Sequence, residues 1–167
     1  MPAPSNIALL SFEKNFEDAF AGYITNSIAN VVSNVQVLTP RIPITQAVEL
    51  TTPRITVRFA VSSTPITENI GSTGIMSGSR YYAERVGSME ITCAVRRDID
   101  GIDNLRGAVR VAMLEVTQAF TSANLPYYKV SFVRETGSSL ATFEPNDEIL
   151  ATIGYEVTFA IKPDQWA

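Results

Sequence analysis

Apolar residues recur every three or four positions near the start of the chain, which is the period of an amphipathic helix. This stripe consists of Phe12, Phe16, Phe20, Ile24 and Ile28, with Ala19 and Tyr23 beside it. Acidic residues lie off the stripe near its beginning, where the helix dipole favours negative charge. The pattern predicts a helix over residues 11–29, with Ser11 as its N-cap.

A second helical pattern follows the aspartate-rich segment 98–103. Its apolar positions are Ile102, Leu105, Val109, Met113, Val116 and Phe120. Asp100, with Asp103 three residues later, approximates a capping box, so we expect Asp100 to be the N-cap. Pro126 supplies a stop signal after the pattern. These features predict a helix over residues 102–120.

The other apolar segments alternate with period two, as half-buried strands do. They lie around Val35 and Val37 and at 55–62, 80–96, 128–132, 140–143 and 149–161. Gly87 indicates a bulge or bend within the third of these segments. Segments 137–139 and 144–147 have the composition of turns, and Gly154 predicts a bend in the long last strand.

Residues 62–79 are rich in Ser, Thr and Gly without an apolar period, and predict a long flexible loop. Each amphipathic helix needs one apolar surface to lie on, and alternating strands give a sheet two different faces. We therefore expect a two-layer α+β fold with an antiparallel or mixed sheet of about four to six strands and both helices packed on one face. At this length we expect residues 1–167 to form a single domain.

Composition narrows the function. The chain has no histidine and one cysteine, Cys93, which excludes a histidine base, a histidine metal ligand and an internal disulfide. A formal net charge of -4 does not suit a dedicated nucleic-acid binder. No apolar run approaches the ~18 residues of a membrane span. We expect a protein that is not an enzyme, with no cofactor, no metal and no membrane association.

Three segments allow a chemical interpretation beside a structural one. Residues 98–103 open like a calcium loop, but the twelfth position is the apolar Val109, and helix capping explains the same aspartates. Glycines within 71–78 lack the Gly-Lys-Ser/Thr ending of a phosphate loop. Cys93 shares a face with apolar residues, which is typical of a core thiol. Paired carboxylates for hydrolysis stay open, because sequence does not show spatial pairs.

Ten of the thirteen basic residues are arginines, and six of these arginines lie in the middle of the chain. Between positions 80 and 110 lie Arg80, Arg85, Arg96, Arg97, Arg106 and Arg110. Residues 111–167 carry three basic against seven acidic residues. This asymmetry suits a head-to-tail interface between identical subunits. Ordinary surface salt bridges are the alternative for each arginine.

The order of elements carries a resemblance. An amphipathic N-terminal helix leads to a strand at 53–61, a Gly/Ser-rich loop, and a strand at 89–97 that runs into the helix at 102–120. The chain closes on a long strand with Tyr155, followed by Trp166. This layout resembles the tail terminator (tail completion) proteins of tailed bacteriophages and the related neck proteins.

The resemblance implies a homo-oligomeric ring, expected to be a hexamer, that caps the tail tube, stops its polymerisation and docks the head connector. The implied partners are other copies of the chain, the tail tube protein and connector or neck proteins, with DNA passing through an acidic, Ser/Thr-rich lumen without specific binding. The implied location is the virion tail or neck, assembled in the host cytoplasm. The loop at 62–79 would then order on docking.

The candidate contact residues on this interpretation are Arg80, Arg85, Arg96, Arg97, Tyr155 and Trp166. The alternative function is a tail tube or other neck or adaptor component of a phage or contractile injection apparatus, which would share the fold but polymerise.

Overall fold

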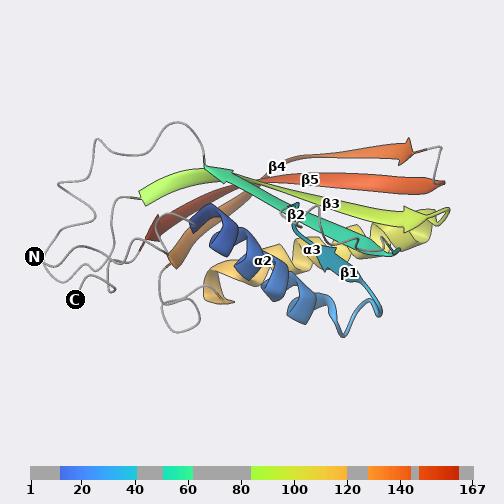
Figure 1. Ribbon diagram of the computed structural model, residues 1–167, viewed down its shortest axis with the longest axis horizontal. Helices are drawn as coiled ribbons and strands as arrows, with labels where there is room; N and C mark the ends of the chain where they lie inside the picture. The colour runs from blue at the N-terminus through green and yellow to red at the C-terminus, as the bar shows by residue number, and fades with distance from the viewer. Residues whose placement is uncertain (1–11, 41–50, 62–83, 120–127, 144–146, 162–167) are drawn as a thin grey trace, which may run out of the picture.

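The computed structural model describes residues 12–40, 51–61, 84–119, 128–143 and 147–161. Within these ranges the chain forms two helices and five strands (Figure 1). In chain order they are α2 (Phe12–Ile28), β1 (Gln36–Leu38), β2 (Arg54–Val61), β3 (Glu84–Arg96), α3 (Ile99–Ala119), β4 (Tyr128–Phe143) and β5 (Glu148–Ile161). The loop expected at 62–79 lies outside the described residues, as do Ser11, Phe120 and Pro126.

The five strands form one sheet in the order β1-β2-β3-β5-β4. β1 pairs with β2 in parallel, and the remaining neighbours are antiparallel. Both helices lie on the same side of the sheet (Figure 1). The expected two-layer α+β fold, with a mixed sheet and both helices on one face, is therefore confirmed.

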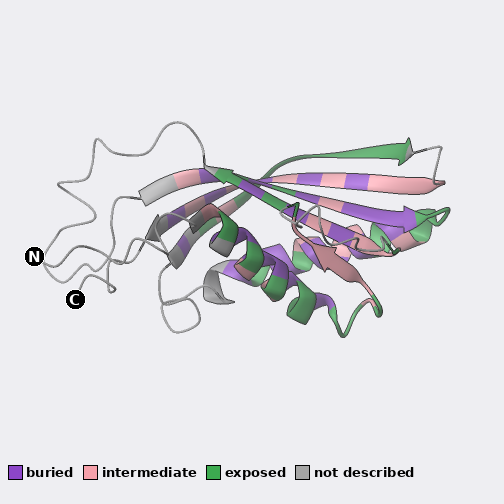
Figure 2. Cartoon of the chain, in the orientation of Figure 1, coloured by how far each residue is buried: buried purple, intermediate pink, exposed green. Residues whose placement is uncertain are grey.

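The core lies between the helices and the sheet face that they cover. Alternate residues of β2, β3 and β5 point into it, while the residues between them remain partly or fully exposed (Figure 2). Phe16 of α2 anchors this layer, because its ring lies 4.7 Å from the ring of Phe59 on β2 and 5.0 Å from that of Phe159 on β5. Phe20 packs 5.0 Å from Phe16 one turn later. Burying rings of this size supplies much of the hydrophobic driving force for folding.

The start of α3 differs from the sequence interpretation. The helix begins at Ile99, and its N-cap is Asp98 rather than Asp100. The carboxylate of Asp98 accepts a hydrogen bond from the backbone N–H of Gly101 at 2.9 Å, and its carbonyl accepts one from Ile102 at 3.0 Å. An aspartate run contains several possible caps, and only backbone geometry selects one of them.

The turn expected at 137–139 is wrong, because β4 continues through these residues. The bulge or hairpin expected at Gly87 is wrong too, because β3 keeps its register with β2 and with β5 there. At Gly154, β5 keeps its register with β3. A Cβ on Gly87 would lie 2.4 Å from the ring of Phe59, and one on Gly154 would lie 2.8 Å from the hydroxyl of Thr136. β4 does have a register shift between Glu135 and Gly137. Gly87 and Gly154 therefore mark close approach of a neighbouring strand, and the irregularity of β4 lies opposite Gly154, where the expected bend of β5 stays a prediction.

Candidate assembly surfaces

The sheet face that points away from the helices, called here the outer sheet face, is polar. Its exposed or half-buried members include Thr56, Arg58, Ser88, Glu90, Thr92, Thr152, Glu156 and Thr158. Charges of opposite sign lie close together on it: Arg58 is in register with Glu90, and Arg134 of β4 donates to Glu156 at 3.3 Å. The described side chains of this face are thus mixed in charge, and the expected acidic lumen stays a prediction.

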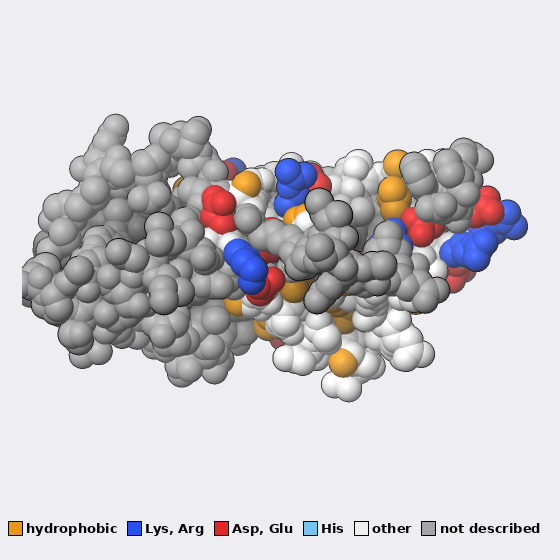
Figure 3. Space-filling view, in the orientation of Figure 1, with side chains coloured by type: hydrophobic (Ala, Val, Ile, Leu, Met, Phe, Trp, Pro, Cys, Tyr) orange, Lys and Arg blue, Asp and Glu red, His pale blue; other side chains and the backbone are white. Residues whose placement is uncertain are grey.

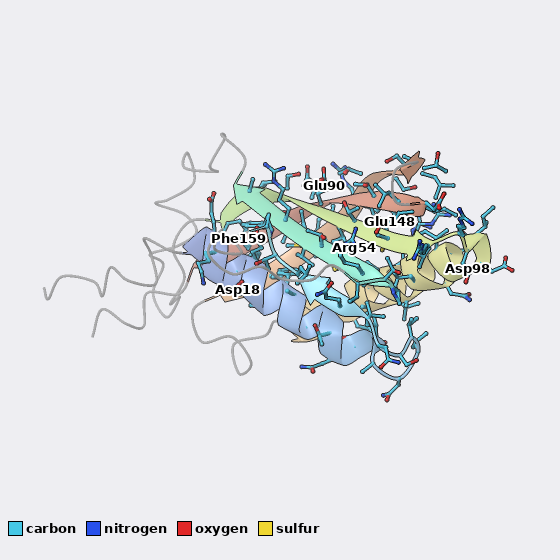
Figure 4. All side chains as sticks on the ribbon, turned by 45° about the vertical axis from the view of Figure 1, so that its right-hand side comes forward. Asp18, Arg54, Glu90, Asp98, Glu148 and Phe159 are labelled. Carbon is cyan, nitrogen blue, oxygen red and sulfur yellow. The ribbon has the colours of Figure 1, made fainter. Side chains whose placement is uncertain are left out.

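One ion pair on the outer sheet face is largely buried. The guanidinium of Arg54 donates to both carboxylate oxygens of Glu148, at 3.3 and 3.0 Å, and the two side chains are only 12% and 11% exposed. The pair spans β3, where Ala94 is in register with Arg54 and is 1% exposed. Arg54 and Glu148 lie close together toward the end of the molecule at which Asp98 is found (Figure 4). The pair therefore fixes β2 against β5 at that end.

Arg97 stabilises the same end of the molecule. The backbone of Arg97 is in the left-handed region, with a φ of 51°. The backbone N–H of Arg97 donates to the carbonyl of Asp147 at 3.1 Å, and its guanidinium pairs with the Asp147 carboxylate. Arg96 is exposed beside it and is in register with Glu148. Figure 3 shows basic and acidic side chains side by side at this end, at the right of the view.

The other candidate arginines are distributed differently. Arg85 lies on β3 near the opposite end, in register with Phe159. Arg106 pairs with Asp103 at 2.8 Å, and Arg110 with Glu135 at 2.7 Å, so the salt-bridge alternative holds for both. Arg80 and Trp166 lie outside the described residues.

Tyr155 lies in the core and not on the described surface. Its side chain is on the sheet face that the helices cover and is 4% exposed. Burial raises the pKa of its hydroxyl to about 12, and the nearby carboxylate of Glu135 contributes in the same direction. We therefore leave Tyr155 out of the contact surface considered below.

A cleft of about 680 Å³ opens at the end of the molecule where β3 leads into α3, and we call it the end cleft. It is lined by Val31, Val32, Ser33, Thr52, Pro53, Val95, Arg96, Asp98, Gly101 and Asn104. These described residues come from three stretches of the chain, at 31–33, 52–53 and 95–104. Apolar side chains form one part, while Arg96, Asp98 and Asn104 bring charge and hydrogen-bonding groups. Of the predicted contact residues that the structure describes, Arg96 is the one that lines this cleft.

The two edges of the sheet differ in how their backbone hydrogen-bonding groups are paired. At one edge β1 pairs with the start of β2, and farther along the buried carboxylate of Glu17, 1% exposed, accepts a hydrogen bond from the backbone N–H of Phe59 at 2.9 Å. At the other edge no described strand pairs with the outer side of β4. Residues 136–143 of β4 carry no charge, and most of them are exposed, as Figure 2 shows at its upper right. An uncharged open edge of this kind is a template for strand addition by another chain.

The single thiol belongs to the core, as its sequence context indicates. Cys93 is fully buried, and this burial raises the pKa of its thiol to about 12. Because the reactive thiolate is scarce at any pH well below that value, we expect native protein to resist alkylation by iodoacetamide at pH 8. Protein unfolded in urea should react fully under the same conditions, as mass spectrometry would show. Equal rates in the two states would place Cys93 outside a closed core.

The described residues contain no group of three or more histidine, cysteine, aspartate or glutamate side chains that could hold a metal ion. Among the described helices, none is long and apolar enough to cross a membrane.

Comparison with known proteins gives matches to solved structures. No protein-family model and no curated protein sequence matches the chain. Its fold is similar to that of a chain in a solved structure described as "Virion of native gene transfer agent (GTA) particle". The TM-score is 0.51 with 12% sequence identity, over 86% of this chain and 96% of that chain. At this identity the match shows a shared fold.

Proposed function

We propose that this chain is a structural protein of a phage-like particle, and that within it the chain caps the end of a tail tube as a closed ring. In this role it stops tube polymerisation and provides the docking surface for the head connector. It acts by binding and not by catalysis, and its partners are other copies of itself, the tail tube protein and connector or neck proteins.

The observation that carries the proposal is the fold likeness to a chain of a gene transfer agent virion, which spans 96% of that chain. The surface supports an assembly role as well. Among the described residues, a polar sheet face without a covering helix, a strand edge without a pairing strand and the end cleft leave three sides on which neighbouring subunits can pack. Identical subunits that join different patches of their surface form a ring when the rotation between them closes.

The open β4 edge also favours the second candidate, a tail tube or other polymerising component. Strand addition at an unprotected edge can continue from subunit to subunit without a built-in stop. A terminator must end that growth, whereas a tube protein must repeat it. The two roles therefore differ in whether the assembly closes on itself.

Electron microscopy of the purified full chain, at increasing concentration and without tube or connector proteins, separates the two candidates. The proposal predicts discrete rings of uniform diameter. Open-ended tubes whose length grows with concentration would instead identify a tube protein. Particles of single-chain size at every concentration would contradict both roles.

A variant of the β4 edge serves as a control for the route of assembly. Ser139→Lys places a charge in the middle of the uncharged segment 136–143, and a charge on an edge strand opposes pairing with another strand. If subunits join by strand addition at β4, this variant should remain folded and lose assembly. Normal rings would show that the subunits join elsewhere.

A further inference from the structure

We propose that the end cleft binds residues 162–166 of a second copy of this chain, with the indole ring of Trp166 against its apolar part. This inference rests on the proposed function and deepens it, because it names a contact that joins one subunit to the next.

The size and lining of the end cleft suit an aromatic side chain. Its volume of about 680 Å³ is within the range of about 300–1,000 Å³ that binding pockets occupy. Val32, Pro53 and Val95 contribute apolar groups to the lining, and Val31 is 68% exposed at the cleft. An exposed apolar side chain gains from being covered, and a tryptophan ring can bury about 150–250 Å².

The charges of the cleft and of the segment are complementary. The cleft presents Arg96 and Asp98, two residues apart, and the segment contains Lys162 and Asp164 at the same spacing. When the two run in opposite directions, Asp164 faces Arg96 and Lys162 faces Asp98. Matched opposite charges fix the register of a contact and disfavour other partners.

Residues 162–166 that bind in the end cleft must come from another copy of the chain, because the chain's own C-terminal segment cannot reach it. Arg96 at the cleft is in register with Glu148, and β5 then runs 13 residues (161 minus 148) to Ile161. At about 3.3 Å per residue this strand covers about 43 Å. The five residues from Ile161 to Trp166 reach at most about 18 Å even when fully extended. Figure 4 shows the same separation, with Asp98 toward one end and Phe159 toward the other.

Such a contact joins opposite ends of neighbouring molecules, so it is head-to-tail. Contacts of this type give closed rings when the rotation closes and filaments when it does not. The proposed ring needs a contact of this type.

Trp166 is the only tryptophan of the chain, so its fluorescence reports directly on the contact. As the concentration of full-chain protein rises through assembly, the emission should shift to shorter wavelength and become protected from iodide. Trp166→Ala should prevent assembly. Arg96→Glu should raise the concentration needed for assembly by at least about tenfold, as expected when a close charge pair is lost.

Two further variants separate a direct contact from a local effect. Arg106→Glu makes the same charge change on α3 at a residue that does not line the cleft and pairs with Asp103, and it should leave the assembly concentration within about twofold. Combining Arg96→Glu with Asp164→Arg should restore assembly, because it exchanges the two charges. A synthetic peptide of residues 161–167 should compete with assembly, whereas the same peptide with Trp166→Ala should not.

The outcomes distinguish this inference from the proposed function. Rings that form normally with Trp166→Ala, and a Trp166 that stays accessible to iodide within them, would overturn the inference and leave the ring intact. Failure of the charge exchange to rescue Arg96→Glu would overturn the charge pairing in the cleft. Protein that stays single at every concentration would overturn the proposed function together with the inference.

Discussion

Replacing Phe16 with alanine should lower the free energy of unfolding by about 4 kcal/mol. The Phe16 ring is fully buried and lies within 5.0 Å of the rings of Phe20, Phe59 and Phe159, so its removal leaves a cavity where α2 meets the sheet. Urea denaturation followed by circular dichroism measures the change.

The matched control for this prediction is Phe132→Ala. Phe132 lies on the outer sheet face and is 53% exposed, so its loss should change the unfolding free energy by well under half as much. If the two variants were equally stable, Phe16 would not be the residue that fixes α2 to the sheet.

Replacing Glu148 with alanine should cost about 3 kcal/mol of stability. The guanidinium of Arg54 would then be left largely buried without its carboxylate, and an uncompensated buried charge is costly. The double variant Arg54→Met with Glu148→Leu should recover most of the loss, because it removes both charges and keeps apolar volume over Ala94. Denaturant unfolding of the two single variants and the double variant forms the cycle.

The exposed pair of Lys14 and Asp18 provides the comparison. It has a similar length, 2.9 Å, but its side chains are 53% and 44% exposed. Asp18→Ala should therefore cost less than about 1 kcal/mol. A loss at Glu148 no larger than the loss at Asp18 would mean that burial does not strengthen the Arg54–Glu148 pair.

The spacing of hydrophobic residues predicted the two helices well, because each helix buries a single face. The first helix was expected at 11–29 and is Phe12–Ile28, and the second was expected at 102–120 and is Ile99–Ala119. The two-layer arrangement follows from these faces, because each helix has one stripe to bury against one side of the sheet. The cap of α3 was misplaced by two residues because several aspartates in a row satisfy the same local pattern.

Glycine was the least informative residue in the sequence. Gly87 accommodates the ring of Phe59, and Gly154 accommodates the hydroxyl of Thr136. Both contacts join residues from different strands, so the sequence around each glycine does not show the neighbour that requires the small residue there. The uninterrupted β4 strand through 137–139 was missed for the same reason.

The candidate surfaces depended still more on tertiary contacts. Arg54 and Glu148 are 94 positions apart, and the end cleft combines described residues from three stretches of the chain that have no shared pattern. Sequence did single out Arg96, which lines the cleft, but it also singled out Tyr155, which is buried. An alternating strand shows which residues share a face, and only the packing of the helices shows which face is covered.

If this protein works by closing on copies of itself, the mass of the native full-chain particle should show it. We expect one discrete species, a small whole-number multiple of the single chain and expected to be a hexamer, whose mass stays constant as concentration rises above the assembly threshold. A single-chain mass at every concentration, or a mass that grows without limit, would contradict it.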